Sequence, residues 1–370
     1  MKIAIDLTSL ADNLSGMERM TLNITKELLT LNKENCYQLY FKREIHAEFM
    51  QYQMESYVEC VVLPQKNKLW FYQVTLLKAL SKSDADVYLF LAFPPPLLLR
   101  KEKIISTIQD MGCWDCPWTM KKKMVMYFRL MYRNCAHISW RLLTISEFSK
   151  RRILKYLNPA EDKVYVLYLG VSQEMYNCFQ QNWEQIRERY HLPERYIMCL
   201  STMEPRKNME FLVDTYCRLS EEEKGGCSLV LSGRKGWLMN DFLKKVPEME
   251  KKGVHVTDYI EDGDLPYLYR HAEFFVFTSV YEGFGLPPLE AMAVGCPVIC
   301  SDIEALKEIL GDRAVYFRSN DRESLKKVLT DCLKKNKGQS DADVLIEYSR
   351  RFSYEKTARE LDILLNHDYN

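Results

Sequence analysis

The chain contains 370 residues, with 51 basic and 51 acidic side chains, so its formal net charge at pH 7 is zero. This length favours two domains of ordinary size, and an apolar content of 47% is enough to form real hydrophobic cores. The neutral balance argues against a dedicated nucleic-acid binder, so we expect no nucleic-acid partner. No apolar run reaches the length of a membrane span, because the longest, residues 87–99, is interrupted by three prolines.

The sequence starts with a strand-like segment, residues 2–6, instead of a signal peptide, so we expect a cytoplasmic protein. Twelve cysteines are scattered, mostly within apolar runs, as is usual for reduced thiols. Cys113 and Cys116 form one Cys-x2-Cys pair, whereas a zinc site takes four ligands. Residues 84–86 and 341–343 both read Asp-Ala-Asp. We expect the first to cap a strand and the second to lie in a polar loop, so no metal is expected.

Short apolar strands alternate with helical patterns along the first 150 residues, which is typical of βαβ units and parallel sheets. An amphipathic helix is predicted over residues 17–31, and it is opened by Ser15 and Gly16. Strands are predicted over residues 2–6, 38–41, 58–63, 86–91, 104–108 and 142–145.

A second alternating series follows the polar stretch at residues 158–163. Its strands are predicted over residues 196–201, 228–233, 254–260, 274–279 and 297–301. Its helices are predicted over residues 209–220, 241–251, 264–271 and 288–294.

These patterns predict an α/β fold of two doubly wound, Rossmann-like domains with parallel sheets, which face each other across a cleft. We expect the domains at residues 1–168 and 169–350, with a C-terminal helix at 351–370 that packs back on the first domain. Ligands of open parallel sheets bind outside the carboxyl ends of the strands. Candidate functional residues should therefore follow strands.

The strand predicted over residues 274–279 is followed by such a candidate, a glycine turn that leads into a helix. Glu282 precedes Gly283-Phe284-Gly285, and two prolines open the helix that carries Glu290 in its first turn. Backbone N–H groups and the positive end of a helix dipole favour an anion. Carboxylates accept hydrogen bonds from hydroxyls, so the two glutamates suit a phosphate flanked by two polyols, as in a sugar nucleotide.

A second candidate lies after the strand predicted over residues 196–201. Arg206 and Lys207 occupy the strand-to-helix loop, where cations can neutralise phosphate oxygens. Positive charge at a helix start opposes the helix dipole, so a bound anion explains the pair better than a solvated helix start does.

With these segments the sequence resembles the retaining glycosyltransferases of family 4, the glycosyl transferases group 1, which have the GT-B fold. The resemblance covers essentially the whole C-terminal domain and is looser over residues 1–140. The matching segments are SEFSKRRI (146–153), EPRKN (204–208), LVLSGRKGW (229–237), DYIEDGDLPYLYRHA (258–272), EGFGLPPLEAMAVGCPV (282–298) and FSYEKTARE (352–360).

The resemblance implies roles for individual residues. The catalytic residues would be Arg206 and Lys207, which bind the donor diphosphate, and Glu282, which contacts the donor sugar. Glu290 would bind the ribose. The remaining donor-binding residues would be Gly283, Phe284, Gly285 and Leu286 in the turn, Tyr259 and Ile260 beside the base, and Gly16 over the diphosphate.

Three features depart from the family pattern, and one of them is that the N-terminal loop at Ser15-Gly16 lacks the usual double glycine. Ser201-Thr202 stands where many members have Gly-Arg, which removes one phosphate cation. Gln109-Asp110 stands where many have His-Asp near the sugar and acceptor. Gln109 can form hydrogen bonds but does not titrate near neutrality, so a candidate acid–base group is absent.

The resemblance implies a retaining, metal-independent hexosyltransferase without a cofactor. Its donor would be a nucleotide-sugar, GDP-mannose first and a UDP-sugar next. Its acceptor would be a glycan or a polyprenyl-linked glycan of a cell-surface polysaccharide. Two alternatives stay open: a sugar-nucleotide epimerase of the same fold, and a catalytically inactive donor-binding subunit.

Residues 118–133 are a candidate membrane contact. A helix here would place Met120, Met124, Tyr127, Phe128 and Met131 on one face, with lysines beside it. Residues 100–155 hold 13 basic and 4 acidic side chains. This excess favours peripheral contact with the anionic inner face of the cytoplasmic membrane. An ordinary core helix with a basic outer side would show the same periodicity.

Overall fold

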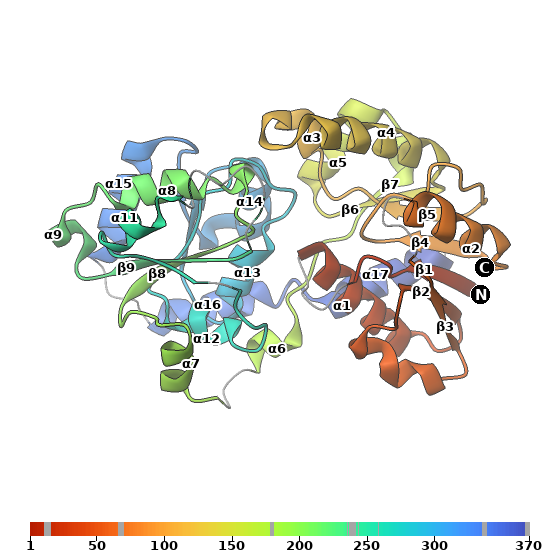
Figure 1. Cartoon of the computed structure of the whole chain (residues 1–370), viewed down its shortest axis with the longest axis horizontal. Coiled ribbons are helices and arrows are strands. Elements are labelled where there is room, and N and C mark those ends of the chain that lie inside the picture. Colours follow the sequence, from red (N-terminus) through yellow and green to blue (C-terminus); the bar gives the residue numbers. More distant parts are fainter. Residues whose placement is uncertain are drawn as a thin grey trace. The chain divides into compact units, whose positions relative to one another are not determined.

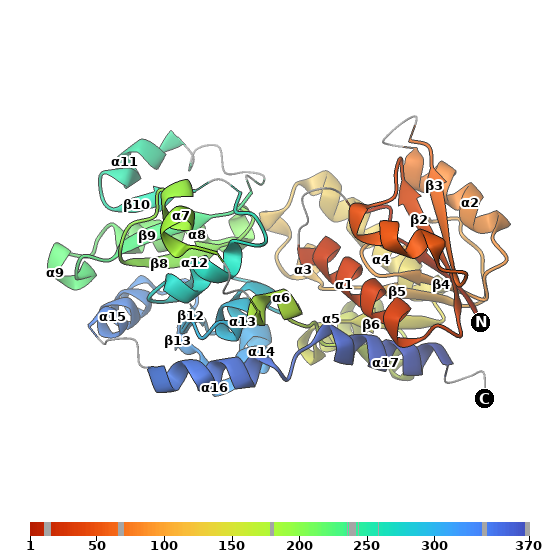
Figure 2. The same cartoon turned by 90° about the horizontal axis from the view of Figure 1, so that it is seen from below.

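The computed structural model describes most of the chain and divides it into two compact units. The described residues are 1–10, 16–65, 70–177, 181–234, 236, 242, 244–257, 259–334 and 339–366. The first unit contains residues 1–117, 121–170 and 352–370, and the second contains residues 118–120 and 171–351. Figure 1 and Figure 2 show helices around a sheet in each unit.

The first unit is built on a seven-stranded parallel sheet with the order β3-β2-β1-β4-β5-β6-β7. The strands are β1 Lys2–Asp6, β2 Cys36–Lys42, β3 Val58–Leu63, β4 Val87–Phe90, β5 Ile104–Thr107, β6 Arg141–Thr144 and β7 Val164–Val166. The strand order reverses between β1 and β4, the kind of switch point at which such sheets bind ligands. Apolar side chains cover both faces, as parallel sheets require.

The helices of the first unit include one from the end of the chain. They are α1 Gly16–Leu31, η1 Ala47–Met54, the π-helix η2 Phe71–Leu76, α2 Leu77–Lys82, α3 Gly112–Asp115, α4 Lys122–Ile138, α5 Glu147–Leu157, η4 Glu161–Lys163 and α17 Tyr354–Asn366. The short η3 Pro117–Thr119 begins in the first unit and ends in the second. α17 packs along α1 (Figure 2), and Asn32 donates from Nδ2 to Asp362 Oδ1 at 2.8 Å. The first unit is therefore completed by the last described residues.

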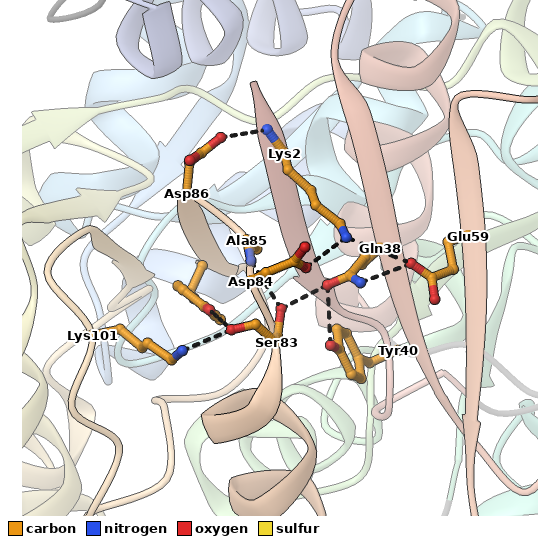
Figure 3. Close-up of polar contacts among 10 residues, drawn as sticks. Lys2, Gln38, Tyr40, Glu59, Ser83, Asp84, Ala85, Asp86 and Lys101 are labelled. Carbon is orange, nitrogen blue, oxygen red and sulfur yellow. Dashed lines mark hydrogen bonds and ion pairs between the residues drawn. The ribbon is translucent and has the colours of Figure 1, made fainter.

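A polar network joins the amino-terminal ends of β1 to β4 (Figure 3). The backbone N–H of Lys2 donates to Asp86 Oδ2 at 2.8 Å, and Lys2 Nζ lies 2.5 Å from Asp84 Oδ1. Ser83 Oγ donates to Gln38 Oε1 at 2.6 Å, and Gln38 Nε2 donates to Glu59 Oε2 at 2.7 Å. The prediction that residues 84–86 cap a strand is confirmed.

The second unit has a six-stranded parallel sheet with the order β10-β9-β8-β11-β12-β13. The strands are β8 Tyr196–Leu200, β9 Ser228–Ser232, β10 Val254–Val256, β11 Phe275–Phe277, β12 Val298–Ser301 and β13 Val315–Phe317. The helices are α6 Gln173–Tyr176, α7 Trp183–Arg189, η5 Pro205–Lys207, α8 Met209–Tyr216, α9 Glu221–Lys224, α11 Val246–Glu250, α12 Leu265–His271, α13 Leu286–Ala293, α14 Glu304–Leu310, η6 Gly311–Arg313, α15 Arg322–Leu333 and α16 Gln339–Ser349.

The predicted fold class, two doubly wound parallel-sheet domains, is confirmed. The strand predicted over residues 254–260 is shorter, because β10 ends at Val256. Residues 341–343 lie within α16 and not in a polar loop, so that prediction was wrong. Among the described residues, no group of three metal-ligating side chains forms a metal site, and no helix is both long and apolar enough to cross a bilayer.

Candidate functional site

The candidate site of the second unit begins where two neighbouring parallel strands end. β8 and β11 pair through Met198 and Phe275, so the loops that follow them leave the same edge of the sheet. The loops are bonded to each other: the N–H of Val280 donates to Arg206 O at 2.9 Å, and Thr278 Oγ1 donates to Lys207 O at 3.0 Å. These two hydrogen bonds place the cations of η5 beside the turn that carries Glu282.

Four charged side chains form a cluster at this edge. Lys207 Nζ lies 2.5 Å from Glu282 Oε1, and Arg206 Nη1 lies 3.5 Å from Glu282 Oε2. Arg206 Nη2 also lies 3.0 Å from Glu204 Oε1. Glu282 and Glu204 are only 7% and 4% exposed. Two cations thus offset two buried carboxylates, so the cluster is formally neutral before any ligand binds.

Glu282 keeps its charge despite its burial. Burial alone would raise its pKa, but the charges of Lys207 and Arg206 and the bond from Lys207 outweigh this effect and lower the pKa below its usual value. The ring of Phe277, whose centroid lies 5.3 Å from Lys207 Nζ, covers the ammonium group. The carboxylate is therefore held ionised and fixed in position.

The turn after Glu282 requires glycine at Gly285. Gly285 caps α13 with a φ of 106°, and a Cβ added there would lie 2.4 Å from Leu306 Cδ2. Pro287 and Pro288 have no N–H, and the N–H of Leu289 donates to Gly285 O at 3.4 Å. Leu286 is the first residue of α13, so its N–H has no acceptor within the helix.

Glu290 lies two residues further into α13 than predicted, because the helix begins at Leu286 and not at Pro288. Glu290 is therefore its fifth residue, and the prediction that it lies in the first turn was wrong. Gly285 is the N-cap of α13, so Pro287 and Pro288 are the second and third residues of the helix, where proline is tolerated. Glu290 is 8% exposed, and Tyr269 of α12 donates from Oη to its Oε2 at 3.3 Å.

Beyond β9 and β10, Tyr259 lies beside an arginine that the sequence reasoning did not select, Arg234. Ile260 is buried, and Tyr259 Oη donates to Asp262 Oδ1 at 3.0 Å. The Cζ atom of Arg234 lies 5.4 Å from the centroid of the Tyr259 ring. Arg234 Nη2 is buried, and no described group accepts a hydrogen bond from it. The signal in the sequence was its position directly after the strand and Gly233.

The remaining candidates belong to the first unit. Gly16 begins α1, and Ser15 lies outside the described residues. Gln109 and Asp110 follow β5 and are half-buried. Gln109 Nε2 lies 3.9 Å from Met20 Sδ, and Asp110 Oδ1 accepts from the N–H of Gly112 at 2.8 Å. The structure thus brings Arg206, Lys207 and Glu282 together and places these three candidates in the other unit.

Comparison with known proteins agrees with this fold. The family model for glycosyl transferases group 1 matches residues 182–352. O-antigen chain mannosyltransferase B of Escherichia coli is 31% identical over 259 residues, which cover 69% of this chain and 68% of the relative. Serotype-specific mannosyltransferase WbdA of Escherichia coli is 29% identical over 197 residues, which cover 52% of this chain but only 24% of that protein.

Among solved structures, that of Anabaena HepE in complex with UDP and glucose has a TM-score of 0.75 and is 15% identical, with 99% of this chain and 100% of that chain covered. At this identity the likeness concerns the fold alone, which is the GT-B fold of glycosyltransferases. The chain belongs to the glycosyl transferases group 1 family.

Proposed function

We propose that the chain transfers a mannosyl residue from GDP-mannose to a hydroxyl of a glycan, in the synthesis of a cell-surface polysaccharide. The names of the two Escherichia coli relatives, both mannosyltransferases, support the sugar. A polyprenyl-linked glycan at the cytoplasmic face of the membrane is the proposed acceptor, and a UDP-sugar is the second choice of donor.

The observation that carries the proposal is the neutral cluster of Arg206, Lys207, Glu204 and Glu282 beside the turn before α13. A diphosphate that arrives here meets two cations whose positions are already fixed by buried carboxylates. Charge grows on this diphosphate as the sugar leaves, and preorganised cations stabilise that charge without reorganisation. Arg206 and Lys207 thus do the work that a metal ion does elsewhere, and the proposed reaction uses neither metal nor cofactor.

Glu282 has two roles in this proposal. It orients Lys207 through the 2.5 Å contact, and its second oxygen accepts a hydrogen bond from a hydroxyl of the donor sugar. Glu290, oriented by Tyr269, accepts from the ribose. Backbone N–H groups of Gly283, Phe284, Gly285 and Leu286 serve the sugar and phosphate.

We assign the base of the donor to Tyr259, Ile260 and Arg234. The buried Nη2 of Arg234 has no acceptor among the described residues, and a guanidinium presents two parallel N–H groups. Guanine offers two neighbouring acceptors, O6 and N7, that match this pair, whereas uracil has no such edge. This match supports GDP over UDP as the nucleotide of the donor.

The proposed transfer proceeds with retention at the anomeric carbon. The acceptor hydroxyl attacks the face that the diphosphate leaves, and a phosphate oxygen of the donor takes the acceptor's proton. Gln109 supplies no titrating group, which is consistent with a step that uses no side-chain base. Gln109 and Asp110 are the proposed residues on the acceptor side, and Gly16 is the proposed contact to the diphosphate.

The test combines donor binding with turnover. In a thermal-shift panel of sugar nucleotides, only the true donor should raise the melting temperature strongly, since it binds the folded state. Lys207→Ala and Glu282→Ala should each lower kcat about 100-fold or more, by analogy with the loss of one charge-stabilising donor. Lys245→Ala, which removes an exposed lysine paired with Glu210, is the matched control.

Near-normal turnover by Lys207→Ala or Glu282→Ala would refute the assignment of the cluster. Binding of GDP-mannose without transfer or hydrolysis would favour the inactive donor-binding subunit. Conversion of the donor to an epimer would favour the epimerase.

A further inference from the structure

The outer surface of α4 carries apolar side chains where a surface helix normally carries polar ones. Met126, Tyr127 and Leu130 are 71%, 47% and 54% exposed. These positions are three and four residues apart, so the side chains are neighbours on one stripe of the helix. An exposed apolar stripe of this kind commonly marks a surface that contacts something else.

This stripe shares only Tyr127 with the face that the sequence predicted. Met131, placed on the predicted membrane face, is fully buried, and the inner side of α4 also includes Val125 and Cys135. Met131 and Cys135 face the core of the first unit, where Cys135 packs with Ile108, Leu142 and Ile153 among others. The helix is therefore apolar on two sides, and only the inner side is explained by the core.

Basic side chains flank the outer stripe. Lys122 and Lys123 are exposed before it and Arg133 is exposed after it, and α4 contains no acidic residue. No carboxylate of the described residues forms an ion pair with Lys122 or Lys123. The stripe thus has an apolar centre and positive ends.

We propose that the outer stripe of α4, formed by Lys122, Lys123, Met126, Tyr127, Leu130 and Arg133, docks on an anionic lipid surface. Its apolar side chains enter the boundary between headgroups and acyl chains, and its cations contact lipid phosphates. Three apolar side chains are few for a stable protein–protein interface, which buries about 800 Å² on each partner. Shallow insertion of these side chains into a lipid surface, assisted by the neighbouring cations, does not require such a large buried area. This inference does not depend on the identity of the donor.

The test is sedimentation with vesicles of phosphatidylcholine alone or with about a third of phosphatidylglycerol. The wild-type chain should bind only the anionic vesicles. K122E/K123E should bind the anionic vesicles at least about tenfold more weakly than the wild type, since each cation near such a surface contributes to affinity. K251E/K252E makes the same change of charge at two exposed lysines of the second unit and should bind like the wild type.

A second variant, M126S/L130S, keeps every charge and should also bind at least several-fold more weakly, with an unchanged circular dichroism spectrum. Equal binding by wild type and K122E/K123E would overturn the proposal, as would equal losses in K122E/K123E and K251E/K252E. Analytical ultracentrifugation tests the alternative partner. If the wild type is a dimer and M126S/L130S is a monomer, the stripe binds a second copy of the chain, and the proposal of lipid binding is overturned.

Discussion

Replacing Lys207 by Met tests whether the buried cluster stabilises the fold as well as the proposed chemistry. Methionine has a similar length but no charge, so the substitution removes the ammonium group and leaves packing against Phe277 largely intact. Glu282 would then remain buried with one cation, Arg206, at 3.5 Å. The consequence is a carboxylate that has lost its closest partner.

The expected loss of stability follows from this geometry. Removal of one partner from a buried ion pair costs about 3–5 kcal/mol, and the retained Arg206 keeps the loss near the lower end, about 3 kcal/mol at pH 7. For a unit of this size each kcal/mol lowers the melting temperature by about 2–4 °C. Lys207→Met should therefore melt about 6–12 °C below the wild type.

The loss should depend on pH with a definite sign. In the wild type the pKa of Glu282 lies below its usual value near 4.5, so its stabilising effect is present above pH 4.5 and is lost as the pH falls through the lowered pKa. In Lys207→Met, burial dominates and the pKa of Glu282 should rise. The carboxyl then takes up a proton at a higher pH, so the gap between the two proteins should narrow between pH 7 and pH 4.

Differential scanning calorimetry at several pH values measures this gap. The double variant K207M/E282Q removes both charges and should recover most of the stability lost at pH 7. The reasoning is refuted if Lys207→Met loses less than about 1 kcal/mol. A gap that stays constant from pH 7 to pH 4 would refute it equally.

Two further predictions concern the turn and the base. Gly285→Ala should lower the free energy of unfolding by about 2–3 kcal/mol, because alanine disfavours the φ of 106° and its Cβ would meet buried Leu306. A Cβ added at Gly16 would have no atom within 4 Å, so Gly16→Ala should change the free energy of unfolding by no more than about 0.5 kcal/mol. Urea titration measures both variants. Arg234→Ala should weaken GDP at least about tenfold relative to UDP in isothermal titration calorimetry, because a bidentate pair is worth about 1–3 kcal/mol; an unchanged ratio contradicts the guanine assignment.

Much of the fold followed from local pattern. The strands predicted at residues 2–6 and 58–63 have these bounds in the structure, because each is mostly apolar and rich in residues that favour strands. β7 and β13 were not predicted as strands, since three residues give too short a pattern to separate a strand from a loop. Their existence depends on the neighbouring strands with which they pair.

The face of α4 shows a different limit. Helical periodicity identifies apolar stripes, but α4 has two of them, and the predicted face combined the buried Met131 with the exposed Tyr127. Which stripe packs depends on the residues of β6 and α5 that meet it, such as Leu142 and Ile153. That information is distributed over three elements and is not local.

The candidate site divides in the same way. Arg206, Lys207 and Glu282 were selected as neighbours of a phosphate, yet their contacts with one another were not predicted. Those contacts arise because β8 and β11 are adjacent although 74 residues of chain lie between Leu200 and Phe275. Arg234 was missed because one arginine after a strand is not distinctive until its guanidinium is seen over Tyr259 with Nη2 buried.

The packing of α17 along α1 has a consequence for synthesis. A ribosome releases the residues of the second unit before it releases residues 354–366, so the second unit can complete its sheet while the first still lacks a helix. A fragment that stops near residue 350 would leave uncovered the side of α1 that packs against α17. A stop codon late in the gene would thus damage the half of the protein that was translated first.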